Sequence, residues 1–243
     1  MKLLIDQGNT RTKMVLVDHD NFITSLVSEQ LKENKFNDFI KNINIDKVVY
    51  ASVAQMPPFL EEFCEKNAIN IKSLAIKTSG SKNRLNNVYG FYNNLGADLL
   101  ATALYAHELG NGKPTLTISM GSCITCVVVK ADGKYMGGSI SPGLNMRASA
   151  LHQYTHALPL VDVNKKLKNK KLPSIRFAKN TKDVILKGIV SGIEGELLNY
   201  ICDFKHLYQT GKVFLTGGDA YYFKDLIGVE VVENMVLKGL DLL

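Results

Sequence analysis

Two stretches of the chain share one pattern: a short apolar run, a polar turn with glycine, and a second apolar run. In the first stretch, residues 3–17, the turn is Asp6-Gln7-Gly8-Asn9-Thr10. In the second, residues 115–130, the turn is Met120-Gly121-Ser122. Each stretch predicts two strands joined by a tight turn. Because the pattern recurs, we predict two duplicated halves with a nucleotide between them, its phosphates held from both sides.

The first turn has the residue types of a phosphate-binding loop. Gly8 can adopt a positive φ and lets a ligand approach the backbone closely, and such a turn presents several backbone N–H groups to an anion. Asp6 would repel a phosphate unless a cation lay between them, which suggests Mg²⁺, a hard cation that prefers oxygen ligands. An ordinary hairpin with Asp6 as a turn residue has the same pattern, so both interpretations stay open at this point.

The remaining apolar pattern predicts alternating strands and helices, which is typical of an α/β sheet fold. We expect further strands over 21–28, 47–53, 69–76 and 213–216, with short strands over 230–232 and 236–237 closing the sheet. We expect helices over 32–42, 59–67, 95–109, 144–156 and 184–200. The break at Gly110-Asn-Gly-Lys-Pro114 predicts a domain boundary, with an N-terminal half over 1–110 and a C-terminal half over 111–243.

Several polar and glycine positions have two interpretations each. Asp98 lies in the first turn of an expected helix, where the helix dipole favours an acid and where a general base could also be held. The glycine-rich segment 137–143 is either a plain loop or a loop that approaches a ligand. Glycines at 188, 192 and 195 suggest close packing of a long helix, inside the protein or against a second copy. Gly217-Gly218-Asp219 follows a strand as another nucleotide-like turn.

Composition and charge limit which cellular location and which partners we expect for this protein. The chain has 243 residues and four cysteines, too few for a disulfide framework at this length. It has no basic segment followed by a long apolar one at its start and no apolar run of about 18 residues, so we expect a cytoplasmic protein without a membrane span. Residues 165–182 are rich in Lys and Arg and lack acids. That stretch is a solvated basic loop, or it attracts an anionic substrate or nucleic acid, although stacking on bases is poorly supported by Phe177 alone.

Taken in order, these motifs resemble the type III pantothenate kinase family, of the acetate kinase/sugar kinase/Hsp70/actin superfamily. The matching segments are Asp6–Thr10, Gly96–Asp98, Gly137–Gly143, Ala150–Pro159, Asn180-Thr181 and Thr216–Ala220, within a resemblance that runs from Lys2 to Leu240. It implies an α/β fold of two ribonuclease H-like (actin-like ATPase) halves with a nucleotide cleft between them. It also implies ATP-dependent phosphorylation of pantothenate to 4'-phosphopantothenate, the first step of coenzyme A biosynthesis.

The resemblance implies a role for each matching residue. Asp98 would be the catalytic base that takes the proton from the primary hydroxyl of pantothenate, and Asp6 would act through Mg²⁺ at the phosphates of ATP. The substrate-binding residues would be Tyr89, Gly96, Ala97 and Thr181, with Thr181 near the interface of a homodimer. The nucleotide-binding residues would be Asp6, Gly8, Asn9, Thr10, Lys13, Gly121, Ser122, Gly217 and Gly218. Pantothenate and ATP would be the small-molecule partners, and no nucleic acid is expected.

Three positions depart from the pattern of the family. Ser119 stands where the family has an Asp associated with a monovalent cation, K⁺ or NH₄⁺, and Val127 stands near a second missing Asp. Leu99 replaces an Arg that grips pantothenate, and leucine cannot imitate an Arg–carboxylate pair. Arg147 or a lysine could substitute for it. The monovalent cation, with Ser119 as its metal-site residue, therefore stays an open part of the prediction. Two alternatives also stay open: a weak or inactive member with a binding or regulatory role, and a kinase of another small alcohol.

Overall fold

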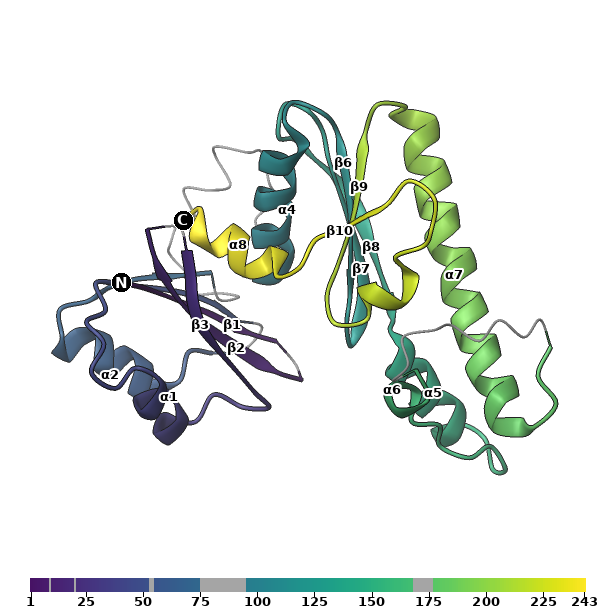
Figure 1. The fold of residues 1–243 in the computed structure, drawn as a ribbon, viewed down its shortest axis with the longest axis horizontal. Coiled ribbons are helices and arrows are strands. Elements are labelled where there is room, and N and C mark those ends of the chain that lie inside the picture. The colour runs from purple at the N-terminus through teal and green to yellow at the C-terminus, as the bar shows by residue number, and fades with distance from the viewer. Residues whose placement is uncertain (9, 20, 53–54, 75–94, 168–176) are drawn as a thin grey trace. The chain divides into compact units, whose positions relative to one another are not determined.

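The chain divides into two compact units. The computed structural model describes residues 1–8, 10–19, 21–52, 55–74, 95–167 and 177–243 (Figure 1). One unit comprises Met1–Tyr105 with Asn234–Leu243, and the other comprises Ala106–Glu233. The first limit between them lies inside one helix, α4 (Ala97–Gly110), and the second lies between Glu233 and Asn234. A functional division between residues 110 and 111 stays a prediction.

The first unit is built on a five-stranded sheet with the order β3-β2-β1-β4-β5. Its strands are β1 (Lys2–Gln7), β2 (Thr12–Asp18), β3 (Asn21–Ser28), β4 (Lys47–Ser52) and β5 (Asn70–Ser73). β1, β2 and β3 form an antiparallel meander, whereas β4 runs parallel to β1 and β5 parallel to β4. The strand–turn–strand pattern predicted for residues 3–17 is therefore confirmed.

Helices cover both faces of this sheet. On one face, Leu3 and Ile5 share an apolar core with Phe36 of α1 (Glu33–Phe39) and Leu60 of α2 (Pro58–Lys66). On the other face, α8 (Met235–Asp241) packs on β1 and β4. A Cβ on Gly239 would lie 1.9 Å from the carbonyl oxygen of Ala101, so glycine lets α8 lie directly against α4.

The closing strand expected over 236–237 is wrong. These residues belong to α8, in which Met235, Leu237 and Leu240 are buried. A two-residue apolar run has the same appearance in a strand and in a buried helix, so the periodicity could not separate them.

The second unit repeats the sheet of the first. Its strands are β6 (Thr115–Met120), β7 (Cys123–Val129), β8 (Tyr135–Pro142), β9 (Lys212–Thr216) and β10 (Glu230–Val231), in the order β10-β9-β6-β7-β8. Again the first three strands form an antiparallel meander, and the next strand runs parallel to the first. The predicted duplication of the strand–turn–strand pattern thus extends to the whole topology of each sheet.

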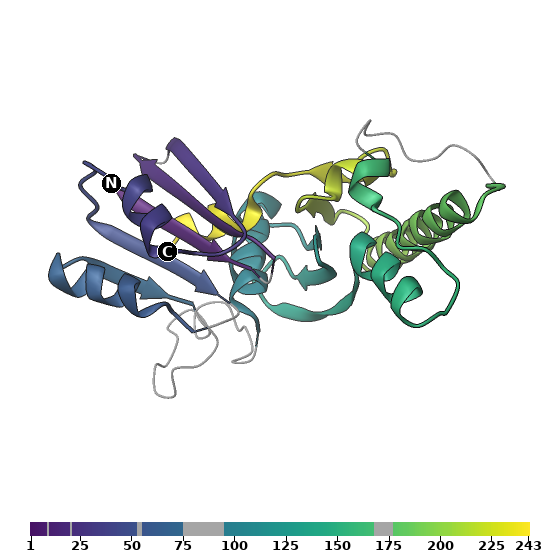
Figure 2. The same cartoon turned by 90° about the horizontal axis from the view of Figure 1, so that it is seen from below.

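The core of the second unit lies between its sheet and the long helix α7 (Thr181–Leu207). α5 (Leu144–Gln153) packs beside α7, as Figure 1 and Figure 2 show, and α6 (Val163–Lys166) packs on α5. A short 3₁₀ helix, Ala220–Phe223, follows β9. None of the helices in the described ranges is long and apolar enough to span a membrane.

The glycine-rich segment 137–143 is not a loop, because residues 137–142 belong to β8. A Cβ on Gly138 would lie 1.9 Å from the carbonyl oxygen of Cys126 in the neighbouring strand β7. The glycine is therefore needed for the close approach of two strands, which the composition of the segment alone does not reveal.

Candidate active site

The first predicted turn joins β1 to β2 and begins at Asp6. Asp6 pairs with Lys13 across β2 and with Ala51 across β4. Because Leu3 and Ile5 point into the α1–α2 core and alternate residues of a strand face opposite sides, the Asp6 carboxylate lies on the other face. The N–H of Gly8 donates to the carbonyl of Arg11 at 3.0 Å and closes the turn. The φ angle of Gly8 is not in the positive range, although glycine could adopt it.

Asp98 lies in the first turn of α4, as predicted. Its Oδ1 accepts a hydrogen bond from the backbone N–H of Leu99 at 2.9 Å. A Cβ on Gly96 would lie 2.9 Å from the same oxygen, so any larger residue at 96 would press on the carboxylate. The Gly96-Ala97-Asp98 segment therefore leaves room for the acid.

The structure brings Asp6, Lys13 and Asp98 into one electrostatic environment. Burial is the main cause that raises the pKa of Asp6 from 3.8 to about 6, and the negative charge of Asp98 raises it further, whereas Lys13 opposes the shift. A half-buried carboxylate close to a second carboxylate is stabilised by a cation. Mg²⁺ is commonly held by one or two protein carboxylates together with the phosphates of a substrate, so this pair fits Mg²⁺. Within the described ranges, no group of three or more His, Cys, Asp or Glu side chains could hold a metal on its own.

The second predicted turn, Gly121-Ser122, joins β6 to β7 and is packed between two other glycines. A Cβ on Gly143 would lie 2.1 Å from the carbonyl oxygen of Gly121, and the N–H of Gly143 donates to the carbonyl of Ser122 at 3.0 Å. Gly217, with φ +95°, has its Cβ position 2.2 Å from the carbonyl oxygen of Met120. The structure thus brings three glycine motifs of the sequence to one end of this sheet.

The four glycines at this end serve different purposes. Gly143 and Gly217 permit tight backbone packing. A Cβ added to Gly121 or Gly218 would meet no described atom within 4 Å, so these two leave the backbone open to a ligand.

Ser119 lies one residue before the end of β6 in a row of hydroxyl side chains. It pairs with Thr125 of β7 and Thr216 of β9, so the three side chains lie on one face of neighbouring strands. Val127 stands near the second Asp of the family that this sequence lacks. It is buried and pairs with Thr117. The row supplies neutral oxygen ligands and no carboxylate.

The expected pantothenate residues are only partly described. Gly96 and Ala97 adjoin Asp98 in the first unit, and Thr181 is the exposed first residue of α7 in the second unit. Tyr89 lies outside the described residues, as does Asn9 of the first turn. Thr10 is described and exposed.

Leu99 is half-buried. Arg147, the candidate to replace the missing Arg at position 99, already has partners within the protein. The guanidinium of Arg147 donates from Nε to the carbonyl of Pro142 at 2.7 Å and forms an ion pair with Glu196 of α7. Glu196 also accepts a hydrogen bond from Ser141. Sequence reasoning missed Glu196, because its pairing depends on the packing of α7 beside β8 and α5.

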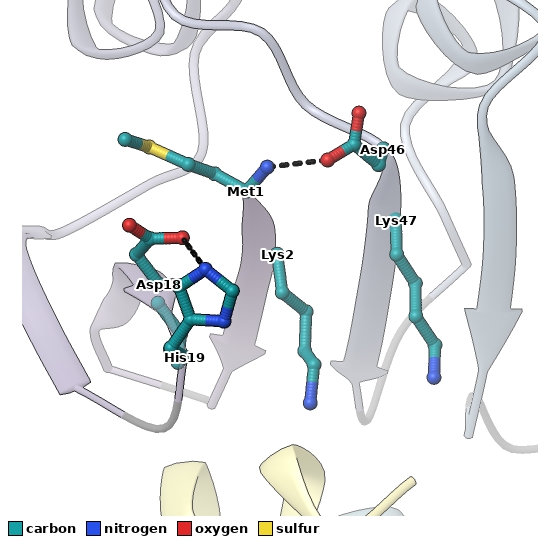
Figure 3. Close-up of a pocket in the computed structure, with 7 residues that line it drawn as sticks. Met1, Lys2, Asp18, His19, Asp46 and Lys47 are labelled. Carbon is teal, nitrogen blue, oxygen red and sulfur yellow. Dashed lines mark hydrogen bonds and ion pairs between the residues drawn. The ribbon is translucent and has the colours of Figure 1, made fainter.

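A pocket of about 290 Å³ in the first unit is separate from these residues. Its lining consists of Met1, Lys2, Val17, Asp18, His19, Asp46 and Lys47, at the opposite end of β1 from Asp6 (Figure 3). The Nζ of Lys2 donates to the Asp241 carbonyl at 2.7 Å and that of Lys47 to the Leu243 carbonyl at 2.8 Å. These lysines hold the end of α8 and the residues that follow it against the sheet, which is a structural role.

Comparison with solved structures identifies the fold. A protein from Campylobacter jejuni described as a Baf family transcriptional activator superposes with a TM-score of 0.59 at 20% identity, covering 98% of this chain and 95% of that one. A protein from Sinorhizobium meliloti described as a 2-dehydro-3-deoxygalactonokinase superposes with a TM-score of 0.57 at 11% identity, covering 100% and 95%. At such identities the likeness concerns the fold alone. It confirms the predicted α/β class of the actin-like ATPase and sugar kinase type.

Comparison with protein sequences identifies the family. The family model described as type III pantothenate kinase matches residues 2–202. The type III pantothenate kinase of Bacteroides fragilis (strain YCH46) is 32% identical over 243 residues, covering 99% of this chain and 96% of the relative. The chain therefore belongs to the type III pantothenate kinase family.

Proposed function

We propose that the protein transfers the γ-phosphoryl group of ATP to the primary hydroxyl of pantothenate, which forms 4'-phosphopantothenate in the first step of coenzyme A biosynthesis. The observation that carries this proposal is the match of residues 2–202 to the type III pantothenate kinase family, and the charge interaction of Asp98 with Asp6 supports the residues assigned to it. A base for the acceptor and a carboxylate for a phosphate-bound cation are both required in phosphoryl transfer from ATP to an alcohol.

In this mechanism the residues of the first unit have separate roles. Asp98 accepts the proton of the pantothenate hydroxyl, and its place between a glycine and the start of a helix keeps the carboxylate accessible. Mg²⁺, when bound, would neutralise phosphate charge beside Asp6. Gly8, Asn9, Thr10 and Lys13 would hold the phosphates, because the turn offers N–H groups and Lys13 a positive charge.

The second unit would hold the rest of the nucleotide. Gly121 and Ser122 would form the second phosphate loop, and Gly217-Gly218 would lie near the adenosine. The open backbone at Gly121 and Gly218 supports this assignment. Tyr89, Gly96, Ala97 and Thr181 would bind pantothenate.

We also propose that the protein is a homodimer formed through α7. Seven exposed positions recur along this helix at alternating spacings of three and four residues: Thr181, Val184, Gly188, Ser191, Gly195, Leu198 and Cys202. Such a heptad pattern of small and apolar residues suits a second helix that approaches closely. No side chain of the described residues would meet a Cβ at Gly188 or Gly195, so the glycines are not explained by packing within the chain. The mass in solution, measured by light scattering, tests this assignment.

The hydroxyl row at Ser119 offers neutral oxygens where the family has an Asp, so the requirement for K⁺ or NH₄⁺ is an open part of the proposal that the assay with and without K⁺ tests. A cytoplasmic location agrees with the four cysteines, all of which are free.

An ATP-consumption assay with pantothenate, with and without K⁺, tests the proposed function. The wild-type protein should consume ATP only with pantothenate, and Asp98→Asn should abolish turnover while Mg·ATP still binds in calorimetry. Asp38→Asn, at an exposed position of α1, is the matched control. Unchanged turnover in Asp98→Asn would exclude Asp98 as the base. Turnover with another small alcohol but not with pantothenate would favour the alternative substrate, and ATP binding without any turnover would favour a regulatory role.

A further inference from the structure

A polar pair, the buried Tyr50 and the half-buried Gln7, lies directly beneath the first phosphate turn. Tyr50 of β4 has no exposed surface, and its hydroxyl donates a hydrogen bond to Oε1 of Gln7 at 2.7 Å. Gln7 is the last residue of β1 and lies between Asp6 and Gly8 in the chain. A contact on the Gln7 side chain therefore acts on the two peptide groups that set the position of the Asp6 carboxylate and the Gly8 N–H.

The strand geometry places this pair on the face opposite Asp6. β1 and β4 are parallel, with Ile5 opposite Tyr50 and Gln7 opposite Ser52. Side chains alternate between the two faces, so Gln7, Tyr50 and Ser52 share the face that α1 and α2 cover. Burial raises the pKa of the Tyr50 phenol, and a hydrogen bond with the buried Ser52 opposes part of that rise. The turn is thus supported from behind by a small polar network.

Packing alone does not explain the network. The buried side chains that surround Tyr50 in this core, such as Leu3, Ile5, Phe36 and Leu60, carry no hydroxyl or amide group. Phenylalanine would fill nearly the same volume as Tyr50 without a buried hydroxyl that needs a partner. A satisfied polar network in an apolar core restricts the backbone to one arrangement, because any shift breaks its hydrogen bonds.

We propose that Tyr50, acting through Gln7, is a positioning residue for the first phosphate turn. The network fixes the end of β1 so that the Asp6 carboxylate, and the turn that the Gly8–Arg11 hydrogen bond closes, are already placed for the phosphates of Mg·ATP. Since a preorganised site loses less conformational freedom on binding, the effect concerns ATP and not pantothenate. The inference rests on the proposed function for its kinetic readout, and its structural readout needs no ligand.

The variant Tyr50→Phe removes only the hydroxyl. We expect the KM for Mg·ATP to rise about three- to tenfold, the range of one lost hydrogen bond, with the KM for pantothenate within about twofold. Amide hydrogen exchange of the peptide over residues 5–12 in the ligand-free protein should accelerate by a similar factor. Tyr208→Phe, whose ring packs on Phe204 in the second unit, is the control and should leave both readouts unchanged.

A second variant separates positioning from stability. In Tyr50→Phe/Gln7→Met, the phenol and the amide are both replaced by apolar groups of similar shape, while Ser52 is kept. The double variant has no amide left without its phenol partner, so its melting temperature should be higher than that of Tyr50→Phe. Under the proposal the KM for Mg·ATP stays raised in this double variant, because nothing fixes the turn. Recovery of the KM along with the melting temperature would overturn it, as would unchanged exchange in residues 5–12. A wild-type protein that binds no Mg·ATP would contradict the proposed function instead, while the exchange result would still test the positioning.

Discussion

Asp6→Asn should stabilise the ligand-free protein at neutral pH and at the same time prevent its use of Mg·ATP. The reason is that the pKa of Asp6 is raised from 3.8 to about 6, mainly by burial. Between these values the folded protein keeps a proton that the unfolded chain has released. The contribution of Asp6 to stability is therefore fully present below pH 3.8 and is lost as the pH rises to about 6.

The magnitude follows from the size of the shift. A shift of about 2 pKa units, at 1.36 kcal/mol each, corresponds to a destabilisation of about 3 kcal/mol above pH 6. Asn keeps a polar group that must also be desolvated, so we expect a net gain of about 1–2 kcal/mol in the free energy of unfolding. For a chain of this length, such a gain raises Tm by about 2–8 °C.

The assay is urea unfolding of both proteins between pH 4 and 8. The difference in free energy between Asp6→Asn and wild type should grow between pH 4 and 6 and then stay level. Asp38→Asn, an exposed carboxylate in the same unit, supplies the reference profile. Addition of Mg·ATP should raise the Tm of the wild type and not of Asp6→Asn. A pH-independent difference, or a less stable Asp6→Asn at pH 8, would refute the reasoning about burial.

Two further predictions concern α4 and its contact with α8. Leu99→Arg should lower the KM for pantothenate about 10- to 150-fold and leave the KM for ATP unchanged, because a charge-assisted hydrogen bond to the carboxylate is worth about 1.5–3 kcal/mol. Leu99 is half-buried, so the longer side chain has a route to solvent, and a folded variant without any gain for pantothenate would mean that another residue holds the carboxylate. Gly239→Ala should destabilise the protein by about 1–3 kcal/mol, since its Cβ would lie 1.9 Å from the Ala101 carbonyl oxygen. Val236→Ala on the same helix is the control for thermal unfolding, and an equal Tm for both variants would contradict the close packing.

The features that the sequence predicts correctly are set by neighbouring residues. Both turns were placed from a few adjacent residues, because a glycine between apolar runs has a local conformational effect. The order of strands and helices followed from apolar periodicity over short windows. Asp98 was located as a helix N-terminal acid for the same reason. Two segments were exceptions: 236–237, which is too brief to show a period, and the glycine-rich 137–142, whose strand the composition did not reveal.

Other properties depend on strands and helices that are far apart in the chain. The purpose of Gly138 became visible only beside the carbonyl of Cys126, and that of Gly239 only beside Ala101. The ion pair between Arg147 and Glu196 likewise forms because α5 and α7 pack together.

The family, the two turns and the acids at which the chemistry is expected follow from residue type and local order, and they can therefore be read from the amino-acid sequence. The state of those residues depends on contacts that the fold creates. The pKa of Asp6 arises from burial and from Asp98, which lies far along the chain, and the support of the turn arises from Tyr50 on a neighbouring strand. Electrostatic and hydrogen-bond energies depend on distances in space, and the fold sets those distances.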